Sequence, residues 1–125
     1  MTDKKKIKTF VQEVLGCGCS EDVFKIIEET GQEYKRVGYS RINIGNRLLV
    51  YLFRTDNKQF ILDELKQNLQ MGVADRDENG FNRFRLVYAL RQPAEIGASA
   101  KKVFDSLGVD DRTHIHVVNS QIIDF

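Results

Sequence analysis

An unbroken apolar run at residues 48–53, Leu-Leu-Val-Tyr-Leu-Phe, constrains the fold more than any other segment of the sequence. Successive side chains of a strand point to opposite faces of a sheet, so a strand without polar positions must be covered on both faces. The run follows Gly45-Asn46, a dipeptide that favours the two-residue turn of a β-hairpin. We therefore predict antiparallel strands at residues 34–44 and 47–54, with the second strand at the centre of the sheet.

Hydrophobic periodicity, capping residues and glycine or proline stop signals assign the remaining elements. They predict helices at residues 3–15, 20–30, 56–71 and 93–107, and strands at residues 84–90, 114–118 and 121–125. The expected order is α-α-β-β-α-β-α-β, with a hairpin at the C-terminal end. Right-handed crossovers make the later strands parallel neighbours. We expect an α+β or α/β fold, a single-domain layered sandwich with a mixed sheet of about four to five strands.

Length and composition place the chain among single globular domains. Its 125 residues are 42% hydrophobic and 30% charged, with one proline and nine glycines, so residues 1–125 are expected to form one domain. The longest apolar run is too short to cross a bilayer. Lys8, Gln12 and Glu13 interrupt the segment that would be apolar in a signal peptide. These features predict a cytoplasmic protein with no membrane partner.

Cys17-Gly18-Cys19, between the first two predicted helices, is the most unusual local sequence. Cysteines one residue apart are not the disulfide framework of a small secreted protein, so we expect a reducing compartment. A helix that starts after Ser20 would favour thiolates, the form that attacks disulfides and binds soft metals. A disulfide here would need Cα atoms roughly 5–7 Å apart and would be readily reduced. The competing interpretation is that both cysteines pack as small buried side chains.

His114-Ile115-His116 places two imidazoles on the same face of a predicted strand. Together with Cys17 and Cys19 they make a set of four ligands suited to zinc, although the two pairs lie far apart in the sequence. An iron–sulfur cluster would need the same four residues, or cysteines shared across a dimer. The alternative is that both histidines lie on the strand without binding a metal.

The 19 basic and 18 acidic residues nearly cancel, but they are unevenly distributed. Residues 34–55 and 81–93 hold eight basic residues and no acidic residue, which leaves the rest of the chain at a net charge of −7. Strand alternation indicates an arginine-bearing sheet face that could bind a phosphate or carboxylate, formed by Arg41, Arg83, Arg85 and Arg91. RNA is a weaker candidate, because the glycine and aromatic pattern of RNA-binding sheets is missing. Alternatively, the arginines pair with acidic helices that cover the sheet.

Other signatures of known chemistry do not occur in the sequence. Residues 75–80 begin like a calcium-binding loop, but Leu86 stands where that loop requires a bidentate glutamate, so a polar loop between helix and strand is expected. The dinucleotide, phosphate-loop, zinc-protease and serine-hydrolase motifs are all missing. No general acid or base can be assigned, and the sequence does not decide whether the chain is an enzyme.

Residues 15–24, Leu-Gly-Cys-Gly-Cys-Ser-Glu-Asp-Val-Phe, resemble small prokaryotic proteins of unassigned function that carry a Leu-Gly-Cys-x-Cys-Pro segment before Val-Phe. Ser20 stands at the position of the proline. The resemblance covers ten residues and implies no established activity, but it directs attention to Cys17 and Cys19.

Three hypotheses for the function follow from these features. The leading one is a small domain whose Cys17 and Cys19 carry out thiol redox chemistry or bind a soft metal. The second is a non-catalytic binding module whose arginine-bearing face holds an anionic ligand or RNA. The third is a protein-interaction subunit or a homodimer that pairs through an exposed strand edge.

Overall fold

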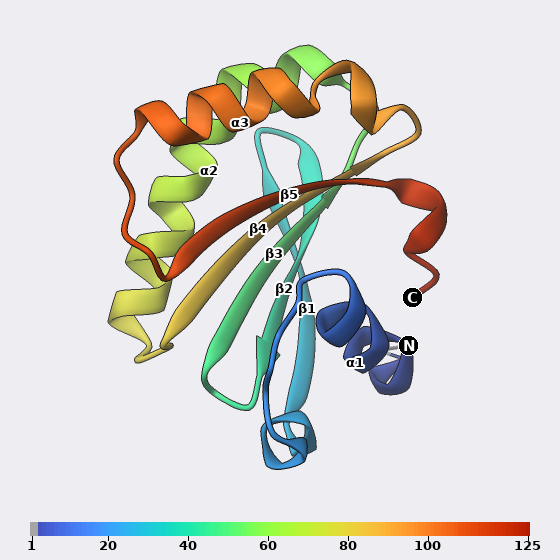
Figure 1. Cartoon of the computed structure of the whole chain (residues 1–125), viewed down its shortest axis with the longest axis vertical. Coiled ribbons are helices and arrows are strands. Elements are labelled where there is room, and N and C mark those ends of the chain that lie inside the picture. The colour runs from blue at the N-terminus through green and yellow to red at the C-terminus, as the bar shows by residue number, and fades with distance from the viewer. Residues whose placement is uncertain (1–2) are drawn as a thin grey trace.

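Five strands form one mixed sheet with β3 (Leu48–Arg54) as the middle strand (Figure 1). The computed structural model describes residues 3–125. The other strands, in sheet order around β3, are β1 (Ile27–Tyr34), β2 (Val37–Ile44), β4 (Arg83–Leu90) and β5 (Thr113–Asn119). The α-helices are α1 (Lys4–Glu13), α2 (Lys58–Glu78) and α3 (Gly97–Ser106), and short 3₁₀ helices occur at η1 (Glu21–Lys25), η2 (Pro93–Glu95) and η3 (Ser120–Ile122). The predicted mixed sheet of an α+β protein is confirmed.

β3 is the spine that its apolar run predicts. It pairs antiparallel with β2 and parallel with β4, and six of its seven residues are buried. The turn between β2 and β3 uses Gly45 at φ +62° and Asn46 at φ +57°, the left-handed conformations that a two-residue hairpin turn requires. The predicted hairpin and the central place of its second strand are therefore both confirmed.

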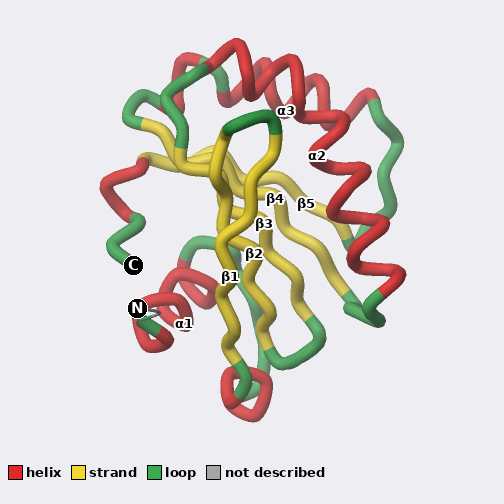
Figure 2. Tube along the Cα trace, turned by 180° about the vertical axis from the view of Figure 1, so that it is seen from behind, coloured by secondary structure: helices red, strands yellow, loops and turns green. Residues whose placement is uncertain are grey.

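Helices cover both faces of the sheet, which gives the protein two hydrophobic clusters (Figures 1 and 2). One cluster lies under α2 and α3, and its largest sheet residues are Tyr51, Phe53, Phe84 and Tyr88. The other lies under α1 and includes Ile42, Ile44, Val50, Leu52, Val87 and Ala89 from the sheet. Within residues 3–125, no helix is both long and apolar enough to cross a membrane.

The second predicted helix, residues 20–30, is wrong. The structure has only the five-residue η1 there, followed by the edge strand β1. Ile27 is the one fully buried residue of β1, so the strand shows no alternation of apolar and polar residues. Its backbone pairs with β2 instead, through a hairpin whose turn holds Lys35 and Arg36 at positive φ. The order in the structure is therefore α-β-β-β-α-β-α-β, with β1 and β5 as the sheet edges that a predicted homodimer would use.

Other element boundaries also differ from the predictions. The predicted strand at residues 34–44 begins only at Val37, because residues 35–36 form the turn after β1, and the predicted helix at residues 93–107 is divided into η2 and α3. The α2 helix continues through Gly72 to Glu78, so residues 75–78 are helical rather than part of a polar loop. Residues 121–125 do not form a hairpin strand, because η3 turns the chain away from the end of β5. The C-terminal residue instead packs on the α1 side of the sheet. There the centre of the Phe125 ring lies 5.6 Å from the centre of the Phe10 ring in α1.

Candidate functional site

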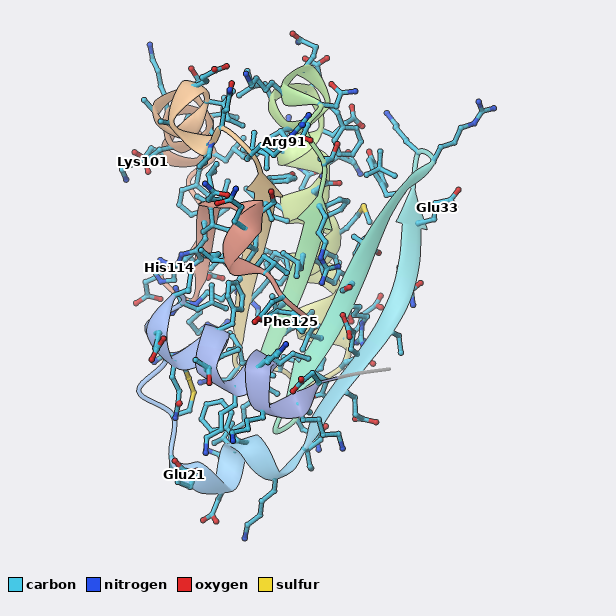
Figure 3. The ribbon with its side chains drawn as sticks, turned by 90° about the vertical axis from the view of Figure 1, so that its right-hand side faces the viewer. Glu21, Glu33, Arg91, Lys101, His114 and Phe125 are labelled. Carbon is cyan, nitrogen blue, oxygen red and sulfur yellow. A yellow bond between two sulfur atoms is a disulfide. The ribbon has the colours of Figure 1, made fainter. Side chains whose placement is uncertain are left out.

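Cys17 and Cys19 form a disulfide with each other in the segment that connects α1 to η1 (Figure 3, yellow bond). Gly16, at φ +67°, ends the helical segment, and the N–H group of Cys17 donates to the Val11 carbonyl oxygen at 3.2 Å. The Cα atoms of the two cysteines are 5.2 Å apart, within the expected range. Both side chains are half-buried against the cluster under α1, so the disulfide is neither sealed in the core nor fully exposed.

A cavity of about 300 Å³ lies beside this disulfide. One wall is the segment from Cys17 to Ser20, together with Val23 of η1. The opposite wall comes from the starts of β3 and β4 and consists of Arg47, Leu48, Asn82, Arg83 and Arg85. The two features that the sequence analysis treats as rival sites, the cysteine pair and the arginine-bearing strand, thus border the same cavity.

The parallel pairing of β3 and β4 brings the three arginines of this cavity together. Leu48 pairs in register with Arg83, and the Arg47 carbonyl accepts hydrogen bonds from the N–H groups of Asn82 and Arg83 at 2.7 and 3.0 Å. Arg85 lies two residues along β4, so it shares the face of Arg83. This face is the α1 side of the sheet, and the prediction that Arg83 and Arg85 lie on one face is confirmed.

The arginines of the cavity carry positive charge without acidic partners. In the described part of the chain, neither Arg47, Arg83 nor Arg85 forms an ion pair with a carboxylate. The Nε atom of Arg85 is buried and has no hydrogen-bond partner. Burial and then the charge of Arg83 lower the pKa of the Arg85 guanidinium. Glu21, the first acidic residue after the disulfide, is itself paired with Lys8.

The predicted place of Arg41 on this face is wrong. Strand β2 turns Ile42 and Ile44 toward α1, so alternation turns Arg41 to the other side of the sheet. There its Nε and Nη2 atoms donate to the Asp75 carboxylate of α2 at 2.7 and 2.8 Å. For Arg41, the competing interpretation that sheet arginines pair with acidic helices is confirmed.

Arg91 is also separate from the cavity. It follows the last residue of β4, at the end of the strand opposite to Arg83, and Figure 3 shows it far from the disulfide. Its Nε atom donates to the Asp56 carboxylate at 2.9 Å, and its N–H group donates to the same carboxylate. The predicted four-arginine face therefore reduces to Arg83 and Arg85. Arg47 lines the cavity together with these two arginines. Its position directly before the central strand is the feature of the sequence that could have indicated this.

His114 and His116 lie on the α1 side of β5, in the strand next to the arginines. His114 pairs in register with Arg85 and is exposed, and His116 is half-buried with an unpartnered Nε2 atom. Burial, followed by the charges of Arg85 and His114, lowers the pKa of His116 to about 4. No three His, Cys, Asp or Glu side chains of residues 3–125 cluster closely enough to hold a metal ion. The cysteines and histidines do not come together as the four-ligand set needed for zinc or an iron–sulfur cluster.

The helix that the sequence places after Ser20 does not support the cysteines. η1 is a single five-residue 3₁₀ helix, and Ser20 makes no side-chain cap hydrogen bond to it. The positive charge in the cavity that the cysteines line comes instead from Arg47, directly before β3, and from Arg83 and Arg85 of β4. Comparisons with family models, curated proteins and solved structures found no match to this chain. The geometry of the cavity is therefore the feature that bears on function.

Proposed function

We propose that Cys17 and Cys19 are a thiol–disulfide exchange centre that alternates between a disulfide and a dithiol. The observation that carries the proposal is the half-buried disulfide in the wall of a cavity with three arginines. A disulfide is attacked by a thiolate, so its partner needs both access to the sulfur atoms and a site in which to bind. The cavity of about 300 Å³ beside the disulfide supplies both.

The exchange takes place in two substitution steps, each with a thiolate as nucleophile and a thiolate as leaving group. The thiolate of a small-molecule thiol attacks one sulfur of the Cys17–Cys19 bond, forming a mixed disulfide and releasing the other cysteine as a thiolate. A second thiolate attacks the sulfur of the small molecule, which breaks the mixed disulfide. The products are the oxidised small-molecule disulfide and the protein dithiol, so two thiols lose two electrons and two protons and the cysteines gain them. The reverse sequence reoxidises the protein with a small-molecule disulfide.

The surroundings of the cysteines favour this chemistry over packing alone. Arginine charges near a cysteine stabilise the thiolate, which is both the attacking and the leaving form in the exchange. Gly18 adds no side chain over the disulfide and is itself exposed. Two buried structural cysteines would need neither the accessible cavity nor the unpaired arginines.

The other hypotheses draw less support from the geometry. Soft-metal binding through two thiolates needs further ligands, and the described residues provide no cluster of three. Binding of RNA on an open sheet face is disfavoured because α1 covers one face and α2 and α3 cover the other. A pocket that binds an anion without redox chemistry would use the same arginines, but it would leave the role of the disulfide unexplained.

The proposal is tested by equilibrating the folded protein in buffers with different ratios of reduced to oxidised dithiothreitol, a neutral dithiol. Free thiols are trapped with iodoacetamide and counted by mass spectrometry. We expect a reversible two-electron transition in which Cys17 and Cys19 gain and lose alkylation together. The Cys17→Ser/Cys19→Ser variant is the control for alkylation at other sites.

Two outcomes would contradict the exchange centre. One is a disulfide that dithiothreitol reduces only after the protein is unfolded by urea. The other is a reduced, folded protein that does not form the Cys17–Cys19 bond again when it is returned to oxidised dithiothreitol. A native transition that reverses fully supports the proposal, and near-ultraviolet circular dichroism shows that the fold persists throughout.

A further inference from the structure

The cavity beside Cys17 and Cys19 contains positive charge that the protein does not neutralise. Arg47 and Arg83 are exposed at its rim, and Arg85 is half-buried. The structure gives none of them a carboxylate partner within residues 3–125, although the chain pairs Arg41, Arg76 and Arg91 with acids elsewhere. Charged groups that line a cleft are usually paired or neutralised by what binds there. Because these guanidinium groups have no carboxylate partner within residues 3–125, we infer an anionic ligand.

Arg85 places a half-buried guanidinium group in the wall of the cavity. Its Nε atom is buried without a hydrogen-bond partner, which leaves a donor of a charged group unsatisfied. The groups next to it on the sheet are Arg83, His114 and His116, and none of them is an anion. A carboxylate or phosphate in the cavity would accept hydrogen bonds from guanidinium groups in the planar geometry that arginine favours.

The size and remaining lining of the cavity limit the ligand. A volume of about 300 Å³ is at the lower end of small-molecule sites, and it is too small for a folded partner. Val23 and Leu48 add apolar surface to the lining, and Asn82 and Ser20 add polar residues. A short aliphatic chain with a sulfur at one end and an anionic group at the other matches this arrangement.

We propose that the substrates of the exchange centre are low-molecular-mass thiols and their disulfides that carry carboxylate or phosphate groups, held by Arg47, Arg83 and Arg85 while their sulfur meets the Cys17–Cys19 bond. This inference rests on the proposed function. Each thiol is held by its own anionic group while its thiolate reacts, and this group changes neither the bonds formed nor the electrons transferred in the two substitution steps. Its contribution is to raise the local concentration of the thiolate and to orient it.

The test measures how fast three thiols of similar size reduce the oxidised protein. The probes are 3-mercaptopropionate, which is anionic, 2-mercaptoethanol, which is neutral, and cysteamine, which is cationic. Each rate is expressed per concentration of thiolate and divided by the rate for an oxidised Cys-Gly-Cys peptide, which removes differences in intrinsic reactivity. At low salt we expect the anionic thiol to be faster than the neutral one by about tenfold and the cationic thiol to be slower, with both differences shrinking as salt is raised.

Arginine variants assign the preference to the cavity. Arg47→Gln/Arg83→Gln removes two exposed charges, and we expect it to reduce the anionic preference to within about twofold of the peptide value. Arg36→Gln/Arg91→Gln is the matched control, since it removes the same net charge from two exposed arginines outside the cavity. Arg85→Gln should weaken the preference as well. Circular dichroism verifies that each variant is folded.

The outcomes separate the two proposals. If the protein exchanges with all three thiols in the same ratios as the peptide, the substrate class is wrong and the exchange centre stands. Equal loss of preference in both double variants would assign the effect to net charge and also overturn the cavity as the anion site. If no thiol reduces the folded protein, the exchange centre fails, and the substrate inference fails with it.

Discussion

Gly72 of α2 lies directly over the ring of Phe84 in β4. A Cβ atom at Gly72 would be 1.9 Å from the Cζ atom of Phe84, and the other ring atoms closest to it would be 2.2 and 2.4 Å away. Phe84 is fully buried and cannot move aside without disturbing its neighbours. The glycine therefore sets how closely α2 approaches the sheet.

Gly72→Ala should destabilise the protein because the added methyl group overpacks the interface between α2 and β4. We expect the free energy of unfolding to fall by about 2–3 kcal/mol, as measured by urea denaturation. Gly97→Ala is the matched control in a helix, since a Cβ there meets no atom within 4 Å. The control should be neutral or more stable by up to about 1 kcal/mol. Equal stabilities for the two variants would mean that α2 has room to shift.

Arg41→Gln should cost more stability than the same change at Arg91. The Asp75 carboxylate accepts hydrogen bonds from Arg41 and from the Tyr51 hydroxyl, and its side chain is only 14% exposed. Removing one partner of such a pair leaves a poorly solvated charge, so we expect a loss of about 2–3 kcal/mol. Arg91 is 76% exposed, and its pair with Asp56 should be worth about 0–1 kcal/mol. Urea denaturation of both variants measures the difference, and equal losses would contradict it.

His116 should make stability depend on pH between about 4 and 6.5. Burial and then Arg85 and His114 lower its pKa from 6.5 to about 4 in the folded protein, whereas the unfolded chain binds a proton near 6.5. The unfolded state therefore holds more protons in this window, and the stabilisation present above pH 6.5 is lost as the pH falls toward 4. The loss should be on the order of 2 kcal/mol after allowance for partial exposure.

The His116→Gln variant isolates this contribution. Its free energy of unfolding should vary less with pH over the same window than that of the wild type, when both are measured by urea denaturation at each pH. His114→Gln is the control from the same strand and face, since His114 is exposed. If His114→Gln flattens the profile and His116→Gln does not, the roles assigned to the two histidines are reversed.

The Cys17–Cys19 disulfide should contribute little to stability. A cross-link between residues two apart closes a very short loop, so it removes little conformational freedom from the unfolded chain. The loop-entropy relation gives about 1.5 kcal/mol, below the typical contribution of a disulfide that closes a long loop. Cys17→Ser/Cys19→Ser should therefore lower the urea midpoint of unfolding by only about 0.5–1.5 M. A loss above about 3 kcal/mol would favour a structural staple over an exchange centre.

The sequence was most informative where a pattern depends on local geometry. Gly45-Asn46 specified the hairpin turn, and the apolar run after it specified a strand covered on both sides. Both features are local, so the hairpin can be predicted without the contacts made by distant segments. The sequence does not predict β1, because nothing local defines this strand. Its stability comes from backbone pairing with β2, which its exposed side chains do not report.

The remaining errors come from tertiary contacts. Gly72 predicts a helix stop, because a stop and a close approach between elements are both marked by a glycine. The face of Arg41 depended on which neighbours of β2 are buried, and only the packing of α1 on Ile42 and Ile44 decides that. Sequence patterns indicate both Cys17 and Arg85 as candidates, but the packing of the α1–η1 segment beside β3 and β4 brings them to one cavity. Sequence spacing contains no measure of that packing.

The middle position of β3 also determines how the molecule opens. Its backbone pairs with strands on both sides, and helices cover both of its faces, so its amide hydrogens reach solvent only when the whole structure unfolds. β1 pairs on one side only and exposes most of its residues, so its free edge can fray while the spine stays intact. The protein should therefore combine slow hydrogen exchange at its centre with fast exchange at the edge strand.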